Sequence, residues 1–382
     1  MMTNDELLNK TISFLRFPLT VGVVFIHFNL AEHGFTIHGV TYGLDHPAWY
    51  DFLINFFSEV LPQIGVPLFF IISGFLFFYH TDFDGNVYKK KLWKRVRTLL
   101  IPYLLWNLIA ILVHASYQIS YLFPNATQEE IHLSFFRLLK SFFANIPNEG
   151  IFVIPAENAV ATYSGFIYPI NLPMWYVREL MVMILLTPAI FWLMKRMGKW
   201  LVIVLGLIYF FYQPLVLPNG GWSVLMCQAA FFFSWGAYYS IHKINFVESL
   251  RQYRYAPLIY LPIAVADALT KGTAYNLYIH QAGILFGIAS VIVVVAYLLE
   301  SGKIKVNATL ANSSFFVYAL HTLIIAEVGK VVFSVLHLSG NLPSMLLLYV
   351  AVPVVTVLLC VALYVFLKRF VPSFCSLLTG GR

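Results

Sequence analysis

Runs of roughly twenty apolar residues recur along the chain and are separated by short polar connections. A helix rises about 1.5 Å per residue, so each run is long enough to cross a bilayer core about 30 Å thick. Hydrophobic residues make up 60% of the chain and charged residues only 11%. The sequence therefore predicts an all-α fold, a polytopic transmembrane helical bundle of about ten spans. We place these spans at residues 12–30, 60–80, 99–122, 173–194, 200–217, 222–241, 256–270, 277–299, 314–336 and 343–367. Residues 1–382 are expected to form a single integral membrane domain with no appended soluble domain.

Positive charge gathers in every second connection between the predicted spans. Lys and Arg crowd into residues 89–97, 195–199, 243–254, 303–305 and the tail beyond Lys368, whereas the intervening connections hold Arg137, Lys140 and Lys271. Cytoplasmic loops carry such an excess, so both termini are predicted to be cytoplasmic. The net charge of +7 then reflects topology and attraction to anionic membrane lipids, and it requires no nucleic-acid partner.

The three cysteines, Cys227, Cys360 and Cys375, show no paired spacing, and two of them lie inside predicted spans. Disulfides and thiolate metal sites are therefore not expected, and we predict no metal centre.

Two ionisable residues share the first apolar run. Arg16 lies near its cytoplasmic boundary, and His27 follows roughly 16 Å further along the helix, in the outer half of the membrane. An ionisable side chain inside the membrane is costly and faces protein or water rather than acyl chains, so both residues are candidates for a functional site.

Five local patterns occur in one order along nearly the whole chain. They are Arg16 with His27 in the first span, the apolar run 66–76 containing Ser-Gly-Phe, the Arg-Val-Arg of 95–97 before the third span, the Met-Trp-Tyr-Val-Arg-Glu-Leu of 174–180, and the Ser-Phe-Phe-Val-Tyr-Ala-Leu-His of 314–321. Together they resemble the membrane acyltransferase-3 family, integral membrane O-acyltransferases that act on surface glycans.

The resemblance implies transfer of an acetyl group from cytoplasmic acetyl-CoA to a hydroxyl of a surface or lipid-linked glycan. It also implies a multi-pass protein of the bacterial cytoplasmic (inner) membrane. Transfer to a sugar hydroxyl needs a base near neutrality, and the imidazole of His27 titrates in that range. The alternative for His27 is a buried packing histidine.

The guanidinium groups of Arg16, Arg95 and Arg97 are expected to bind the phosphates of the donor at the cytoplasmic mouth, since guanidinium forks match phosphate oxygens. Their alternatives are snorkelling to lipid headgroups for Arg16 and topology determination for the other two. Tyr318 and His321, placed in the inner half of the ninth span, either line the path of the pantetheine arm or pack in the core.

At the outer side, Arg178 and Glu179 are candidate catalytic residues, with Arg178 polarising the acyl carbonyl, or else they form a structural ion pair. Trp175 and Glu32 are expected near the acceptor substrate. Acetyl, succinyl and longer acyl donors all fit the pattern, as do direct transfer and a covalent acyl-enzyme, and the sequence fixes neither the acceptor nor the oligomeric state. The alternative function is a transporter or flippase of a lipid-linked glycan or small solute.

Overall fold

The computed structural model describes residues 2–37, 39–43, 45–117, 132–133, 135–144, 152–153, 168–216 and 221–381. The described part of the chain is mostly helical, as predicted, and the strands in it form two small antiparallel pairs, β1 with β2 and β3 with β4. The helices are α1 (Asn4–Ile26), α2 (Leu30–His33), α3 (Ala48–Asn55), α4 (Gly65–Phe78), α5 (Gly85–Arg95), α6 (Ile101–Tyr117), α7 (Phe135–Ser141), α8 (Trp175–Leu185), α9 (Thr187–Met197), α10 (Lys199–Val216), α11 (Gly221–Ile241), α12 (Phe246–Arg251), α13 (Ala256–Leu269), α14 (Asn276–Glu300), α15 (Ala308–Val335), α16 (Leu342–Phe370) and α17 (Pro372–Thr379). The strands are β1 (Phe35–Ile37), β2 (Val40–Tyr42), β3 (His132–Leu133) and β4 (Phe152–Val153).

Seven helical segments in the described part of the chain are long and apolar enough to cross a membrane. An eighth candidate is the pair formed by Leu172–Leu185 and Thr187–Met197, which is bent by 63°. The predicted spans at 200–217 and 256–270 correspond to shorter apolar helices. The fold is thus a multi-span helical bundle, and the count of ten stays a prediction.

Helix boundaries follow capping residues rather than the limits of the apolar runs. The hydroxyl of Thr3 accepts a hydrogen bond from the amide of Glu6, so α1 begins eight residues before the predicted span at 12–30, and it ends at Ile26 with His27 as its C-cap. The side chain of Asn307 likewise caps α15, and that of Asp84 caps α5. Such caps satisfy amide groups that a helix cannot bond internally.

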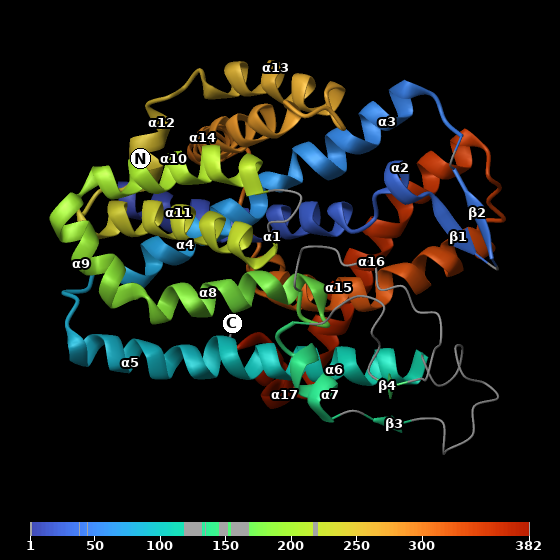
Figure 1. Ribbon diagram of the computed structural model, residues 1–382, viewed down its shortest axis with the longest axis horizontal. Coiled ribbons are helices and arrows are strands. Elements are labelled where there is room, and N and C mark those ends of the chain that lie inside the picture. Colours follow the sequence, from blue (N-terminus) through green and yellow to red (C-terminus); the bar gives the residue numbers. More distant parts are fainter. Residues whose placement is uncertain are drawn as a thin grey trace.

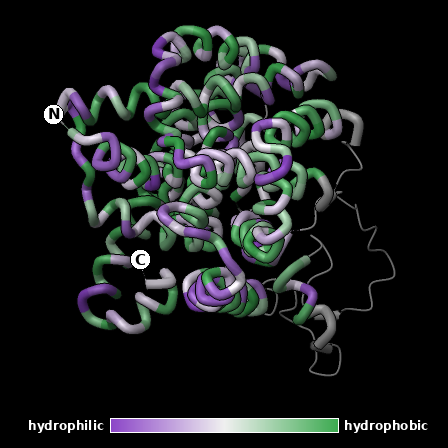
Figure 2. The backbone as a smooth tube through the Cα atoms, turned by 90° about the vertical axis from the view of Figure 1, so that its left-hand side faces the viewer, coloured by the Kyte–Doolittle hydropathy of each residue, from purple (hydrophilic) through white to green (hydrophobic). Residues whose placement is uncertain are grey.

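The bundle has two distinct ends (Figure 1). The N-terminus, α9 and α12 lie toward the left of the view, and α2, β1 and β2 lie toward the right. Figure 2 turns the left end toward the viewer and shows hydrophilic segments where the chain joins its apolar helices. We call this end the basic end, because α9, which carries Lys195, and α12, which follows Lys243, lie there.

Large apolar side chains also point outward from the bundle, on α10, α13 and α16 among others; examples are Leu207, Phe211, Leu258, Leu269, Leu358 and Phe366. Exposed apolar surface of this extent marks contact with lipid rather than water.

Helices α4 and α11 cross in close contact at two glycines. A Cβ added at Gly74 would overlap the backbone carbonyl of Phe233, and one added at Gly236 would overlap the carbonyl of Ile71. Small residues let membrane helices approach in this way. The contact fixes α4, which carries part of the site described below.

We expect Gly74→Ala to destabilise the protein by at least about 2 kcal/mol, because backbone atoms of α11 would have to move to admit the methyl group. Thermal unfolding of the detergent-solubilised protein measures this. Gly85→Ala is the matched control, since no atom lies within 4 Å of the added Cβ. A Gly74→Ala protein as stable as the control would contradict the close contact.

Candidate active site

Two arginines from different helices line one cavity of about 220 Å³. Arg16 comes from α1 and Arg95 from the end of α5, just before a π-helical turn at Val96–Leu100. The walls are completed by α4, α8 and α15, which contribute Ser73, Phe77, Tyr176, Asn312, Ser314 and Tyr318 among others. We call this the arginine cavity.

Neither Arg16 nor Arg95 forms a side-chain hydrogen bond or an ion pair with the rest of the described chain. A cation withdrawn from water without a partner is unfavourable, and it is retained where a ligand supplies the counter-charge. The arginine cavity is therefore suited to an anion. Its hydroxyl groups include those of Ser73 and Tyr176, which hydrogen-bond each other across 3.0 Å.

A row of rings leads from the arginine cavity to His27. Ring centroids are 6.1 Å apart for Tyr176 and Tyr318, 6.3 Å for Tyr318 and His321, and 5.2 Å for His321 and His27. Tyr318 lines the cavity, so the single step from Tyr318 to His321 separates the cavity from the histidine pair. The hydroxyl of Tyr318 donates to the carbonyl of Pro173.

The two histidines lie side by side, so the expectation that they occupy opposite halves of the membrane was wrong. The expected depths of His27 and His321 came from counting residues inward from the predicted limits of the first and ninth spans. The structure instead ends α1 at Ile26, and His27 then lies beside the middle of α15.

His321 has a defined tautomer. Its Nδ1 lies 3.1 Å from the carbonyl oxygen of Val317, and because a carbonyl only accepts, Nδ1 carries the hydrogen. The Nε2 of the fully buried His321 then presents a lone pair, and it has no hydrogen-bond partner in the described structure. The ring nitrogens of the half-buried His27 are likewise without a partner in those residues. His27 can therefore exchange a proton with a bound ligand.

The segment before α8 holds α15 in this position. Asn171 donates through Nδ2 to the carbonyl of Ala319 at 2.9 Å and accepts from the hydroxyl of Thr322 at 3.3 Å. Its backbone amide donates to the side chain of Asn107 on α6. These bonds bracket His321, so the start of α8 positions the ring that faces His27.

Arg178 and Glu179 form a buried pair on α8. Nε and Nη2 of Arg178 lie 2.8 and 2.6 Å from one carboxylate oxygen of Glu179, and Nη1 donates to the carbonyl of Phe143. Glu179 is fully buried. The pair joins α8 to the turn that follows α7, so the geometry favours the structural alternative for both residues.

Removing one member of this pair should be costly, because the other charge is left buried. We expect Glu179→Gln to lower the free energy of unfolding by about 3–5 kcal/mol. The double variant Arg178→Met with Glu179→Leu should lose less than the sum of the single losses. Thermal unfolding of the wild-type protein, Arg178→Met, Glu179→Leu and the double variant gives the coupling, and additive losses would contradict the pairing.

Arg97 and Trp175 lie outside the wall of the arginine cavity. Arg97 is exposed, and its guanidinium carbon lies 5.8 Å from the ring centroid of Trp93. Trp175 begins α8 and packs, half-buried, against the core. Glu32 lies on α2, but its side chain is outside the described part of the structure.

Sequence reasoning missed Ser73 as a polar wall residue, Tyr176 and Asn312. Tyr176 stands beside Trp175 in a motif already singled out, so the motif was the available signal. Nothing in the local sequence of Ser73 indicates that it meets a tyrosine from another helix.

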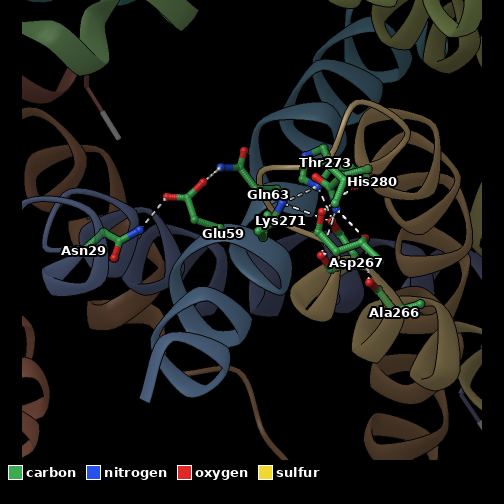
Figure 3. A network of polar contacts seen from close by, with 10 residues as sticks. Asn29, Glu59, Gln63, Ala266, Asp267, Lys271, Thr273 and His280 are labelled. Atoms are coloured by element: carbon green, nitrogen blue, oxygen red, sulfur yellow. Dashed lines mark hydrogen bonds and ion pairs between the residues drawn. The ribbon is translucent and has the colours of Figure 1, made fainter. Parts of the chain in front are cut away.

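Two groups of polar contacts, one around Glu59 and one around Asp267, are drawn in Figure 3. Glu59, in a π-helical turn at Phe56–Val60, accepts from Asn29 and Gln63 at 3.3 Å each. Asp267 accepts from His280 at 2.8 Å and pairs with Lys271 at 3.0 Å. Nothing in the described residues gathers three or more His, Cys, Asp or Glu side chains as metal ligands.

The fold and this site are those of a multi-span membrane protein with an internal cavity lined by two arginines and, close by, two adjacent histidines. Residues 9–365 match the acyltransferase-3 family, described as an acyltransferase domain, so the chain belongs to that family and is an O-acyltransferase. It is also similar to the succinoglycan biosynthesis protein ExoH of Rhizobium meliloti, with 28% identity over 99% of this chain and 94% of that protein. No solved structure matches the chain.

Proposed function

We propose that the protein transfers an acetyl group from cytoplasmic acetyl-CoA to a hydroxyl of a surface or lipid-linked glycan, with His27 as the general base. The observation that carries the proposal is the ring row that joins the two-arginine cavity to His27. Similarity to a protein of succinoglycan biosynthesis supports a glycan acceptor.

In the proposed reaction His27 takes the proton of the acceptor hydroxyl. The oxygen of that hydroxyl attacks the carbonyl carbon of the thioester at the same time. The carbon–sulfur bond then breaks, and the departing thiolate receives from the His27 imidazolium the proton that His27 took from the hydroxyl. Such a base contributes about a hundredfold to ten-thousandfold in rate. We propose that His321, with its hydrogen fixed on Nδ1, positions the ring of His27 by packing against it, with ring centroids 5.2 Å apart.

The donor would enter from the basic end. The arginine cavity, about 220 Å³, is smaller than the roughly 300–1,000 Å³ of typical small-molecule sites. It suits the slender acyl-pantetheine arm and a phosphate group at Arg16 and Arg95 rather than a whole coenzyme. The arm would reach His27 by displacing Tyr318, which separates the cavity from the histidines.

We propose that the acceptor approaches from the other end of the bundle. Asn29 lies two residues beyond His27, so their Cα atoms are at most about 7 Å apart, and Asn29 hydrogen-bonds Glu59. The hydroxyl of Ser58 bonds the carbonyl of Phe25, which holds the neighbouring Glu59 beside the end of α1. Glu59, Asn29 and Gln63 offer hydrogen-bonding groups to a sugar.

This arrangement fits the ten-span topology with cytoplasmic termini in the bacterial inner membrane. The two short apolar helices and the bent pair would supply the spans beyond the seven long ones. Each basic connection then lies on the side where acetyl-CoA is present.

The test is transfer of radiolabelled acetyl groups by the purified protein in lipid vesicles. The acceptor is surface glycan from cells that lack this protein, and mass spectrometry of the product locates the new ester. We expect one labelled ester on a sugar hydroxyl, with succinyl-CoA assayed in parallel. Glycans that are identical in cells with and without the protein, together with no labelled product, would overturn the proposal and favour the transporter.

A further inference from the structure

A second cavity of about 560 Å³ lies at the basic end. Its walls come from the first turns of α1, the turn after α4, the end of α9 and the turn after α11. It shares no wall residue with the arginine cavity. We call it the terminal cavity.

One hydroxyl in the terminal cavity is unsatisfied. Ser240 is 8% exposed, and its Oγ is buried with no hydrogen-bond partner among the described residues. A buried hydroxyl without a partner is unfavourable, so its position on a cavity wall indicates that a ligand supplies the bond. The unsatisfied hydroxyl of Ser240 is an observation independent of the volume of the cavity.

Two cations also line the cavity. Lys195 and Lys243 form no ion pair with any described residue, and the ammonium of Lys195 lies 5.6 Å from the ring centroid of Phe191. Asp5 and Asp82 stand on the same wall, and Asp5 accepts a hydrogen bond from the hydroxyl of Tyr79. Two flexible ammonium groups suit phosphate oxygens.

Aromatic rings provide a surface for a planar base. Tyr79 and His80 have ring centroids 3.9 Å apart, and Phe83 and Phe191 lie on the same wall with centroids 4.9 Å apart. Bases stack on such side chains regardless of base identity. Rings, ammonium groups and a free hydroxyl together match a nucleotide.

The last turn of α4 separates the two cavities. The ammonium of Lys91 donates to the carbonyl of Phe77, which lines the arginine cavity, and to the hydroxyl of Thr81, which lines the terminal cavity. Phe77 and Thr81 are four residues apart, so their Cα atoms are at most about 14 Å apart. A flexible arm can span this distance.

We propose that the terminal cavity binds the adenine nucleotide end of the acyl donor, while the acyl-pantetheine arm occupies the arginine cavity. This inference rests on the proposed function and adds to it a site for the part of the donor that the arginine cavity is too small to hold.

The test compares acetyl-CoA with acetyl-pantetheine, which lacks the nucleotide. Lys195→Gln combined with Lys243→Gln should raise the KM for acetyl-CoA about tenfold or more and leave the KM for acetyl-pantetheine unchanged. Lys199→Gln, at the exposed start of α10, is the matched control and should change neither. Equal changes for both donors, or no change for either, would overturn the inference while leaving the proposed function intact.

Direct binding separates the inference from catalysis. We expect ADP to bind the wild-type protein in detergent and to bind the double lysine variant about tenfold more weakly, as measured by isothermal titration calorimetry. This result would stand even if acetyl transfer were not observed. Wild-type protein that does not bind ADP, or a double variant that binds it equally well, would contradict the nucleotide site.

Discussion

We expect His27→Ala to lower kcat for acetyl transfer by about a hundredfold to ten-thousandfold, because the acceptor hydroxyl then loses the group that removes its proton. The loss should appear in kcat with little change in the KM for the donor, since His27 lies beyond the cavity that would hold it. Steady-state kinetics of purified protein in vesicles measures both constants.

The matched control is His114→Ala. His114 also lies in an apolar helix, α6, but it is exposed and does not line the arginine cavity. His321→Ala should cost less than His27→Ala, because His321 acts only through the orientation of its neighbour. The variant that combines His27→Ala and His321→Ala should have the same kcat as His27→Ala alone, because His321 affects the rate only by positioning His27. If the fold losses in kcat of the two single variants multiplied in the double variant, His321 would act independently of His27.

The sequence predicted the helices well because the hydrocarbon core demands long apolar runs with internal hydrogen bonds. It predicted their ends less well. Apolarity marks the part of α1 that meets lipid, whereas Thr3 and its bond to Glu6 set where the helix begins. The third span shows the same effect, because α5 joins α6 through a π-helical turn in one long helical segment that starts at Gly85.

The spacing of charged residues shows the limit of such local patterns. Glu327 and Lys330 form an ion pair at 2.6 Å on α15, with side-chain exposures of 64% and 41%. Three-residue spacing puts two groups on one face of a helix, but only tertiary packing decides which way that face points.

The site itself depends on contacts between distant segments. The bond between Ser73 and Tyr176 and the contact between His27 and His321 join residues far apart in the chain, and no local pattern encodes them. The motifs placed His27 and His321 among the candidate site residues but missed Ser73 and Tyr176, and the arrangement of both pairs required the packed bundle.

The second large effect concerns Arg16 and Arg95. We expect either residue, replaced by Ala, to raise the KM for acetyl-CoA about tenfold to a hundredfold, because a charge-assisted bond to phosphate is lost. The KM of Arg16→Lys should lie between those of the wild-type protein and Arg16→Ala, because an ammonium group keeps the charge but not the forked geometry of the guanidinium. Arg97→Ala should change KM less, because Arg97 is exposed and outside the cavity wall. An equally large rise in KM for Arg97→Ala would support the original prediction that Arg16, Arg95 and Arg97 all bind the donor.

Stability distinguishes this ligand-binding role from a structural one. A structural arginine is bonded to its surroundings, so its removal lowers the melting temperature. Arg16 has no side-chain hydrogen bond or ion pair with the described residues, so Arg16→Ala should leave the melting temperature of the ligand-free protein unchanged or raise it. Coenzyme A should raise the melting temperature of wild-type protein, because it binds only the folded state, and this gain should shrink in the variant. A fall in the ligand-free melting temperature together with an undiminished gain from coenzyme A would assign Arg16 to the scaffold.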